Sequence, residues 1–217
     1  MKVQILLLYI YIFIASCGNS KCPRYFNVPG HLHPALAEYK VGDTVTVTST
    51  FHREVIGYTN EHEDLGFFDL GNVAFKPVTF IYAIDRDSSE EISVLSESFD
   101  FIENEVFDYA ETIYSEGSAL IGEYNFHNDT FNLSYRLITQ KPGLYYHEFG
   151  SWVGISSQTF DGKCLGDIQV FVNLNVGLNS NIQLLSESPN WFYNTWIPQN
   201  PKSRFYNMGG YAFRVLP

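Results

Sequence analysis

The sequence predicts an all-β protein, built as an antiparallel β-sandwich of the immunoglobulin-like kind. Three observations predict this class: many segments alternate in polarity with a period of two, turn-forming residues separate them, and little supports long helices. Aromatic residues make up 17% of the chain, which is ample for a core. The 217 residues suit one domain or at most two small ones, and we expect a single sandwich domain over residues 31–217.

The clearest strand lies in "YKVGDTVTVTSTF", residues 39–51. Its alternation sets Val45, Val47, Ser49 and Phe51 on one face and threonines on the other. Further candidate strands are residues 77–84, 119–126, 130–138, 143–149, 167–174 and 210–216. The short connection "HND" is rich in turn formers, so it predicts a hairpin between the second and third of these.

One stretch, residues 96–114, is a candidate for a short helix. Its apolar residues recur at three- and four-residue steps from Phe99 to Ile113, although Phe101 and Phe107 disturb the stripe. The acidic residues of this stretch would equally suit an exposed loop. We therefore expect at most one short helix, together with an irregular, aromatic-rich extension at the C-terminus.

The segment "LITQKPGLYYHEF" supports the sandwich class in more detail. A strand ends, the chain turns at Pro142 and Gly143, and Tyr145 opens the next strand. This arrangement resembles the tyrosine corner of immunoglobulin-like domains. The Trp and paired-cysteine pattern of antibody domains is absent, so the segment supports a fold class and no particular family.

The first sixteen residues have the parts of a secretory signal peptide. Lys2 supplies the positive charge, and the apolar run from Val3 to Ala15 has 13 residues, which as a helix would cover roughly 20 Å of a ~30 Å hydrocarbon core. The run is too short to span a membrane and ends at the small residues Ala15 and Ser16. We therefore expect residues 1–16 to be removed during export.

The residues around Cys17 leave two processing chemistries open. Ile14-Ala15-Ser16-Cys17 resembles the bacterial lipobox, in which the cysteine is acylated and becomes the new N-terminus. Ordinary signal-peptide cleavage nearby would instead leave the Cys17 thiol free. With acylation, several chains would hold the protein stably at a membrane, and residues 17–30 would form a lipidated tether.

The two remaining cysteines, Cys22 and Cys164, form a possible disulfide. An exported chain is in a compartment that permits disulfides. Bridging positions this far apart would stabilise the fold by at most ~5 kcal/mol on the loop-entropy account. The alternative is two separate thiols, one in the tether and one in the loop "FDGKCLG".

The charge of the chain excludes nucleic acid as a partner. Removal of the signal peptide takes away Lys2, so 12 of the 13 basic residues remain against 24 acidic ones, a net charge of −12. DNA and RNA phosphates require Lys and Arg to displace their counterions. We therefore expect a protein or glycan partner in place of DNA or RNA.

Motifs that carry chemistry are absent from the sequence. The chain has no zinc-helix, phosphate-loop, dinucleotide or nucleophile-elbow signature, and Ser151 in "GSWVG" is not flanked as an elbow requires. His31 and His33 could share a strand face as metal ligands, with His52 or the loop 61–64 completing the set. We interpret these residues as solvated loops, and we predict no catalytic residues, metal or cofactor.

The C-terminal stretch "WFYNTWIPQNPKSRFYNMGGYAF" provides the one candidate binding site. Trp191, Tyr193, Trp196 and Tyr206 occur there among Asn and Gln, a mixture that can stack on a sugar ring and bond its hydroxyls. The alternative is that these rings cover one end of the sandwich and form a second small core. Burial of several of the rings would remove the main support for a glycan site.

Several segments resemble uncharacterised lipoproteins of Bacteroidetes bacteria, namely "YKVGDTVTV", "FDFIENE", "NDTFNLSYRLITQKPGLY" and "ESPNWFYNTWIPQNPKSRFYNMGGYAFRV". The resemblance implies a membrane-anchored lipoprotein of the cell envelope that acts as a non-catalytic interaction or structural module. In that group an acidic run after the lipidated cysteine often directs the protein to the cell surface. Residues 18–21, "GNSK", stand in its place, which favours the outer membrane facing the periplasm.

Two other functions stay open at this point. The C-terminal aromatic residues would allow a carbohydrate- or peptide-binding lipoprotein. The sequons beginning at Asn128 and Asn132 would allow a secreted glycoprotein of eukaryotic or viral origin with a simple cleaved signal.

Overall fold

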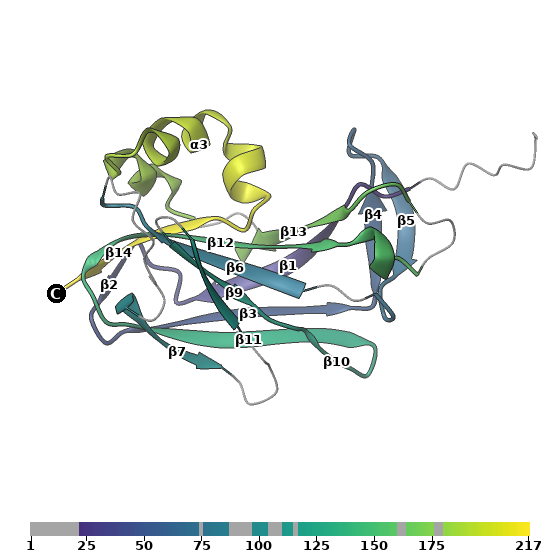
Figure 1. Ribbon diagram of the computed structural model, residues 1–217, viewed down its shortest axis with the longest axis horizontal. Coiled ribbons are helices and arrows are strands. Elements are labelled where there is room, and N and C mark those ends of the chain that lie inside the picture. The colour runs from purple at the N-terminus through teal and green to yellow at the C-terminus, as the bar shows by residue number, and fades with distance from the viewer. Residues whose placement is uncertain are drawn as a thin grey trace, which may run out of the picture.

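The structure is a computed structural model that describes residues 22–73, 76–86, 97–103, 110–114, 117–159, 164–175 and 180–217. The predicted signal peptide and Cys17 lie outside these residues. The described part is the expected mostly-β sandwich, in which two packed sheets are covered on one side by a third layer of short helices (Figure 1). No helix in these ranges is both long and apolar enough to cross a membrane.

The strands form two layers that share β1 (Tyr25–His33). The large sheet contains the first part of β1 together with β2 (Glu38–Lys40), β4 (Glu54–Tyr58), β5 (Asp64–Asp69), β6 (Lys76–Ala83), β8 (Ala110–Tyr114), β9 (Gly117–Ile121), β12 (Gly143–Val153), β13 (Ile168–Leu174) and β14 (Tyr211–Leu216). The small sheet contains the end of β1 together with β3 (Thr44–His52), β7 (Phe99–Glu103), β10 (Asn125–His127) and β11 (Thr130–Thr139). Most pairs are antiparallel, but β1–β13 and β14–β2 are parallel.

The alternation predicted for residues 44–51 is confirmed in β3. Val45, Val47, Ser49 and Phe51 are buried, while the intervening threonines point away from the core. The strand pairs with β11 along nine residues, and the buried side chains of both strands enter the main hydrophobic cluster. The period of two was therefore a reliable guide to the inner face of this sheet.

The predicted hairpin forms, but its first strand is shorter than expected. Asn128 and Asp129 connect β10 to β11 with positive φ angles of 50° and 59°, the backbone that a two-residue hairpin turn requires. Residues 119–126 divide between two layers, because β9 pairs with β6 in the large sheet and β10 pairs with β11 in the small one. Tyr124 lies at the crossing and packs against Phe51 and Phe131.

The helix expected over residues 96–114 is wrong for residues 99–103 and 110–114, although residues 97 and 98 are helical. Residues 99–103 form β7, which pairs with β11, and residues 110–114 form β8, which pairs with β9. Phe99 packs against Tyr145, and Phe101 lies on the same face two residues later. Phe101, which disturbed the three- and four-residue spacing of a helix, therefore fits the two-residue period of a strand.

The boundary between tether and domain is also corrected. Residues 25–30, expected in the tether 17–30, belong to β1, where Phe26 and Val28 are buried and pair in parallel with β13. Cys22 and Cys164 form a disulfide with a Cα–Cα distance of 5.6 Å, as expected from the sequence. Residues 22–30 therefore belong to the domain, because the bond and the strand both hold this segment against the region of β13.

The tyrosine corner expected at the β11–β12 turn is present. The Tyr145 hydroxyl donates to the backbone carbonyl of Lys141 at 3.1 Å, four residues upstream. The ring is buried and stacks on Phe213 of β14. The bond therefore fixes how the chain leaves β11 and enters the central strand of the large sheet.

The C-terminal extension is helical where an irregular chain was expected. It contains η3 (Ile182–Glu187), η4 (Phe192–Trp196), α3 (Ile197–Gln199) and η5 (Lys202–Tyr206), which together we call the cap; a further single turn, η1, is Ile155–Ser157. Figure 1 shows the cap lying over one part of the large sheet. Leu185, Tyr193, Ile197 and Phe205 form a second core with Tyr146 of β12. Because Tyr145 faces the sandwich and Tyr146 faces the cap, alternate residues of β12 serve two separate cores.

Candidate ligand-binding site

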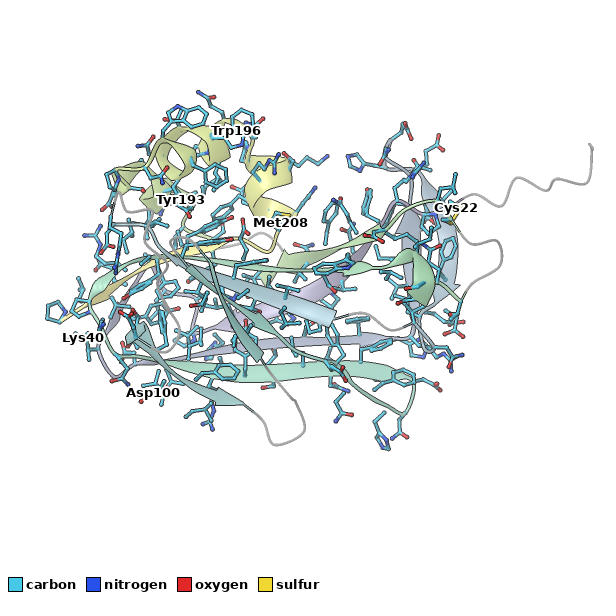
Figure 2. All side chains as sticks on the ribbon, in the orientation of Figure 1. Cys22, Lys40, Asp100, Tyr193, Trp196 and Met208 are labelled. Atoms are coloured by element: carbon cyan, nitrogen blue, oxygen red, sulfur yellow. A yellow bond between two sulfur atoms is a disulfide. The ribbon has the colours of Figure 1, made fainter. Side chains whose placement is uncertain are left out.

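The four aromatic residues proposed from the sequence do not form one surface. Tyr193 is buried in the second core, and Figure 2 shows it beneath the cap on the side of the large sheet. Trp191 is 60% exposed and stacks on Trp196, with ring centroids 5.9 Å apart. Tyr206 is exposed at a different place, at the end of η5. Tyr193 is therefore part of a second core, as the alternative interpretation expected, whereas the other three rings remain at the surface.

Tyr206 lies at a small hollow on the outer face of the large sheet, which we call the trough. Its volume is about 170 Å³, and it is lined by Asn27, Phe171, Val172, Asn173, Tyr206 and Asn207. The floor comes from β1 and β13, and one wall comes from the end of the cap. The β4–β5 hairpin stands at the far side of the same face (Figure 1).

The sheet register places the floor residues. In the parallel pair, Asn27 lies opposite Phe171 and Pro29 lies opposite Asn173. Their neighbours Val28 and Val172 are buried in the sandwich core, so alternation turns Asn27, Phe171 and Asn173 outward. A bridge between Val172 and Met208 holds the end of the cap against β13. Tyr206 and Asn207 are thereby fixed beside the floor.

A row of aromatic rings continues from the trough toward the hairpin. The ring of Tyr25 lies 5.0 Å from that of Phe171 and stacks on Tyr58 at 5.2 Å. The Tyr25 hydroxyl is hydrogen-bonded to Nδ1 of His62, and the Lys202 ammonium lies 3.0 Å from Nε2 of the same ring. Because an ammonium group only donates, Nε2 is the acceptor of this bond. These contacts link the cap directly to the hairpin.

The lining of the trough is polar but uncharged. It carries three side-chain amides and two aromatic rings, and none of its six residues is ionisable near neutral pH. Within the described part of the chain, the amides of Asn27, Asn173 and Asn207 have no hydrogen-bond partner. Each amide offers both donors and an acceptor, so the trough can bind a ligand rich in hydroxyl groups.

A wider groove lies within the cap. It has a volume of about 400 Å³ and is lined by Ile182, Gln183, Ser186, Asn194, Pro198, Pro201 and Tyr206. Its Asn194 amide donates to the Ser188 carbonyl, and its oxygen accepts from Thr195, so this amide is already committed to the fold. The groove is consequently more apolar than the trough, and Tyr206 separates the two.

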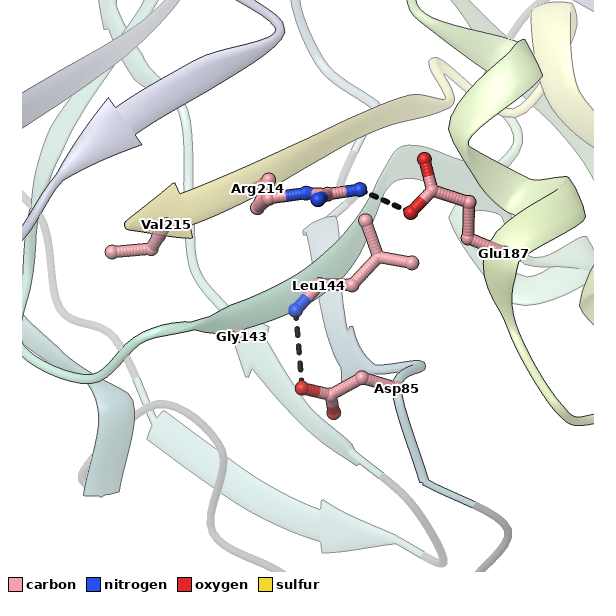
Figure 3. Close-up of a pocket in the computed structure, with 6 residues that line it drawn as sticks. All are labelled: Asp85, Gly143, Leu144, Glu187, Arg214 and Val215. Atoms are coloured by element: carbon pink, nitrogen blue, oxygen red, sulfur yellow. Dashed lines mark hydrogen bonds and ion pairs between the residues drawn. The ribbon is translucent and has the colours of Figure 1, made fainter. Parts of the chain in front are cut away.

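A third pocket, of about 280 Å³, lies where β12 and β14 meet η3 (Figure 3). Arg214 makes an ion pair with Glu187, which fastens the cap to β14. Asp85 accepts the backbone N–H of Leu144 at 3.3 Å. Both of the acids and the one base that line this pocket therefore have structural roles.

Burial strongly shifts the pKa of two titratable side chains of β12, which sequence reasoning did not single out. His147 is fully buried, and burial lowers its pKa to about 4. Nε2 of His147 lies 3.0 Å from the Tyr135 hydroxyl, which lies 2.9 Å from the Thr79 hydroxyl. Nδ1 faces the backbone of Gly209 without a hydrogen bond of ordinary geometry. This polar chain joins the two sheets inside the sandwich.

Glu148, the next residue, points to the opposite face beneath the cap. Burial raises its pKa to about 7, although the nearby Arg204 acts in the other direction. The Tyr146 hydroxyl lies 2.7 Å from Oε1 of Glu148 and 3.1 Å from the backbone carbonyl of Arg204, so it can donate to either. His147 and Glu148 lie on different faces of one strand, so they cannot act as a catalytic pair.

The remaining sequence candidates are spread over the molecule. Ser151 lies inside β12 and pairs with Val170 and Pro77. His31 and His33 point outward from β1, and His52 is exposed at the end of β3. Among the described residues, no three His, Cys, Asp or Glu side chains gather closely enough to hold a metal ion.

The fold defines the class of this protein as a β-sandwich domain with a helical cap. No family of known proteins matches the chain by sequence, and no curated protein matches it. Among solved structures, it is similar to the type II cohesin dyad of the adaptor ScaA scaffoldin of Acetivibrio cellulolyticus, with a TM-score of 0.30 and 11% identity over 72% of this chain. The chain spans about half (49%) of the length of that dyad.

The second type II cohesin module of the same scaffoldin is similar to this chain at the same level. Its TM-score is 0.29 and its identity is 9%, over 70% of this chain and 94% of the module. Likenesses of this size do not define a family for the chain.

Proposed function

We propose that the protein is an exported, membrane-anchored binding module of the bacterial cell envelope that acts without catalysis. The observation that carries the proposal is the trough, a preformed hollow whose rings lie beside three amides that have no hydrogen-bond partner among the described residues. Unpaired amides at a rigid surface cost the fold nothing while water bonds them, and they are available to a ligand. The floor is held in place because β1 and β13 pair with each other, the start of β1 also pairs with β4, and β13 also pairs with β12.

Support for export and anchoring comes from the N-terminal cysteines. The Cys22–Cys164 disulfide is a feature of oxidising compartments. Cys22 follows Cys17 by five residues, so an acyl anchor on Cys17 would hold the domain within about 18 Å of the membrane surface. In this proposal the domain sits directly on the outer membrane and faces the periplasm.

Support for a non-catalytic role comes from the places of the ionisable groups. His147 and Glu148, whose pKa values are strongly shifted by burial, lie inside the sandwich and beneath the cap, whereas the trough is lined by neutral residues. An enzyme site normally brings perturbed acids or bases into the cleft that receives the substrate.

The test uses the native producing cell. We expect the mature N-terminus to carry acyl chains on Cys17, which adds roughly 0.8 kDa by mass spectrometry, and the protein to fractionate with the outer membrane. Photocrosslinking from Asn173, on the floor of the trough, should capture an envelope component, whereas crosslinking from exposed Asn72 on the turn after β5 should not. An unmodified N-terminus on protein released into the medium would exclude the anchor.

One observation keeps a secreted glycoprotein as the second candidate. Asn128 is exposed at the tip of the β10–β11 turn, where a glycan would not disturb the sheet. Asn132 lies within β11, and its side-chain oxygen accepts a hydrogen bond from Thr50. The same mass measurement separates the candidates, because a glycan on Asn128 with an unacylated N-terminus would support this second function.

A further inference from the structure

The trough has features that narrow the ligand beyond the general binding role. Its volume of about 170 Å³ is below the ~300 Å³ at which pockets for whole drug-sized ligands begin. It is therefore suited to one small unit of a larger molecule. The Phe171 ring forms part of the floor and the Tyr206 ring part of the wall, so such a unit would meet an aromatic surface on two sides.

The polar groups of the trough select for hydroxyls over charges. Asn27, Asn173 and Asn207 each present a donor and an acceptor, and within the described residues these amides are unpaired. Lys202, a cation close by, is engaged with His62. An anionic ligand would therefore find no free cation in the lining and would approach a protein of net charge −11 before processing.

On the side of β13, the floor of the trough offers no free backbone ladder among the described residues near Phe171. At the level of Asn27 and Phe171, β1 and β13 bond to each other, and β13 bonds to β12 on its other side. A peptide that binds by adding a strand requires an open sheet edge. A ligand seated between β1 and β13 on this face is therefore held by the side chains that project from it.

We propose that the trough binds one sugar residue of a neutral carbohydrate chain, with its C–H face on Phe171 and Tyr206 and its hydroxyls on Asn27, Asn173 and Asn207. This inference rests on the proposed binding function and names its ligand class. Aromatic rings pack against the apolar face of a sugar, and amides exchange hydrogen bonds with vicinal hydroxyls.

The surface beside the trough can accommodate a neighbouring sugar residue. Trp152 of β12 lies opposite Gln169 of β13, which precedes Phe171 by two residues and therefore points to the same face. The Trp152 side chain is 51% exposed. A chain leaving the trough in this direction would reach a second aromatic ring, so the binding of oligosaccharides should be tighter than that of single sugars.

The test measures binding of the full chain, purified from the producing cell, to an array of neutral oligosaccharides with glucose, mannose, xylose, galactose and N-acetylglucosamine backbones. Calorimetry then gives the affinity for any oligosaccharide that binds. We expect at least one backbone to bind, Asn173→Ala and Asn207→Ala each to weaken it about five- to tenfold, and Trp152→Ala to weaken oligosaccharides more than monosaccharides. The control variants Asn72→Ala and Trp191→Ala, exposed elsewhere, should bind as the parent does.

Three results would overturn the sugar assignment. These are the absence of binding to every neutral backbone, binding to acidic oligosaccharides alone, and binding that Asn173→Ala and Asn207→Ala leave unchanged. Crosslinking in cells shows whether only the sugar assignment is wrong or whether the proposed binding function is wrong as well. If Asn173 still captures an envelope protein while no sugar binds, the protein is a binding module for another ligand class.

Discussion

The hydroxyl of Tyr135 lies 3.0 Å from Nε2 of His147 and connects the two sheets through the centre of the sandwich. Tyr135 belongs to β11 in the small sheet, and His147 belongs to β12 in the large one. The same hydroxyl lies 2.9 Å from that of Thr79 on β6. Buried polar groups favour one arrangement of the layers when each finds its partner, because a shifted sheet would leave them unpaired.

The first prediction concerns this polar chain. Tyr135→Phe removes the hydroxyl shared by Thr79 and His147 and leaves two buried polar groups without that partner. We expect the free energy of unfolding to fall by about 2 kcal/mol, measured by urea denaturation near pH 7.5. The control Tyr206→Phe, at an exposed ring, should change it by less than ~0.5 kcal/mol. If the two variants lower the free energy of unfolding equally, the buried hydrogen bonds of Tyr135 make no specific contribution to stability.

The second prediction concerns His147 and acid. In the unfolded chain its imidazole takes a proton near pH 6.5, whereas in the folded protein it does so only near pH 4. Between these pH values the unfolded state binds more protons, so the contribution of His147 to stability falls as the pH is lowered, by about 3 kcal/mol in total. Denaturation curves between pH 4 and pH 6.5 should show this loss in the parent relative to His147→Gln. Parallel pH profiles of the two proteins would contradict the prediction.

The third prediction concerns Glu148, whose contribution to stability changes with pH in the opposite direction to that of His147. Its carboxyl group has a folded-state pKa raised from 4.5 to about 7, so the folded state binds more protons between these values. Its contribution to stability is therefore full below pH 4.5 and is lost as the pH rises to 7. Partial contact with solvent should keep the loss below ~3 kcal/mol. Relative to the parent, Glu148→Gln should gain stability as the pH rises through this window.

The pH ranges over which His147 and Glu148 titrate overlap, which allows a sharper test. Between about pH 4.5 and 6.5 the contributions of His147 and Glu148 change in opposite directions and offset each other. Glu148→Gln should therefore reveal a stability that rises with pH, and His147→Gln one that falls. If both variants change in the same direction relative to the parent, at least one of the two assigned burials is incorrect.

The sequence predicted the elements whose signal is local. The alternation of β3, the turn at Asn128 and Asp129, and the corner at Tyr145 each depend on residues within a few positions of one another. β1 was missed because its outward residues, such as Asn27 and Pro29, have the composition of a loop. Its strand partner β13 begins 143 residues after the first residue of β1, beyond the range of any local pattern.

The candidate site was predictable only in part, for the same reason. Composition singled out Tyr206, but the trough also requires Asn27 from β1 and both Phe171 and Asn173 from β13. Tyr193 looked equivalent to Tyr206 in the sequence, yet its position in η4 turns it toward Tyr146 and the second core. The direction of each ring depends on how the short helices pack, and their mixed helical turns give no regular period.

The fourth prediction concerns the Cys22–Cys164 disulfide, which holds the first strand of the fold in place. The bond joins the start of β1 to the loop before β13, directly beside the parallel pair that forms the floor of the trough. Cys22→Ser/Cys164→Ser should lower the free energy of unfolding by about 2–5 kcal/mol, since the bond closes a long loop in the unfolded chain. Amide hydrogen exchange should also increase at residues 25–29, where β1 pairs with β13, more than in β3 of the small sheet. A matched measurement on the parent with reductant should give a similar shift, because both treatments remove the same covalent link. If the double variant leaves the free energy of unfolding and the exchange rates unchanged, the pairing of β1 with β13 alone holds residues 22–30 in place.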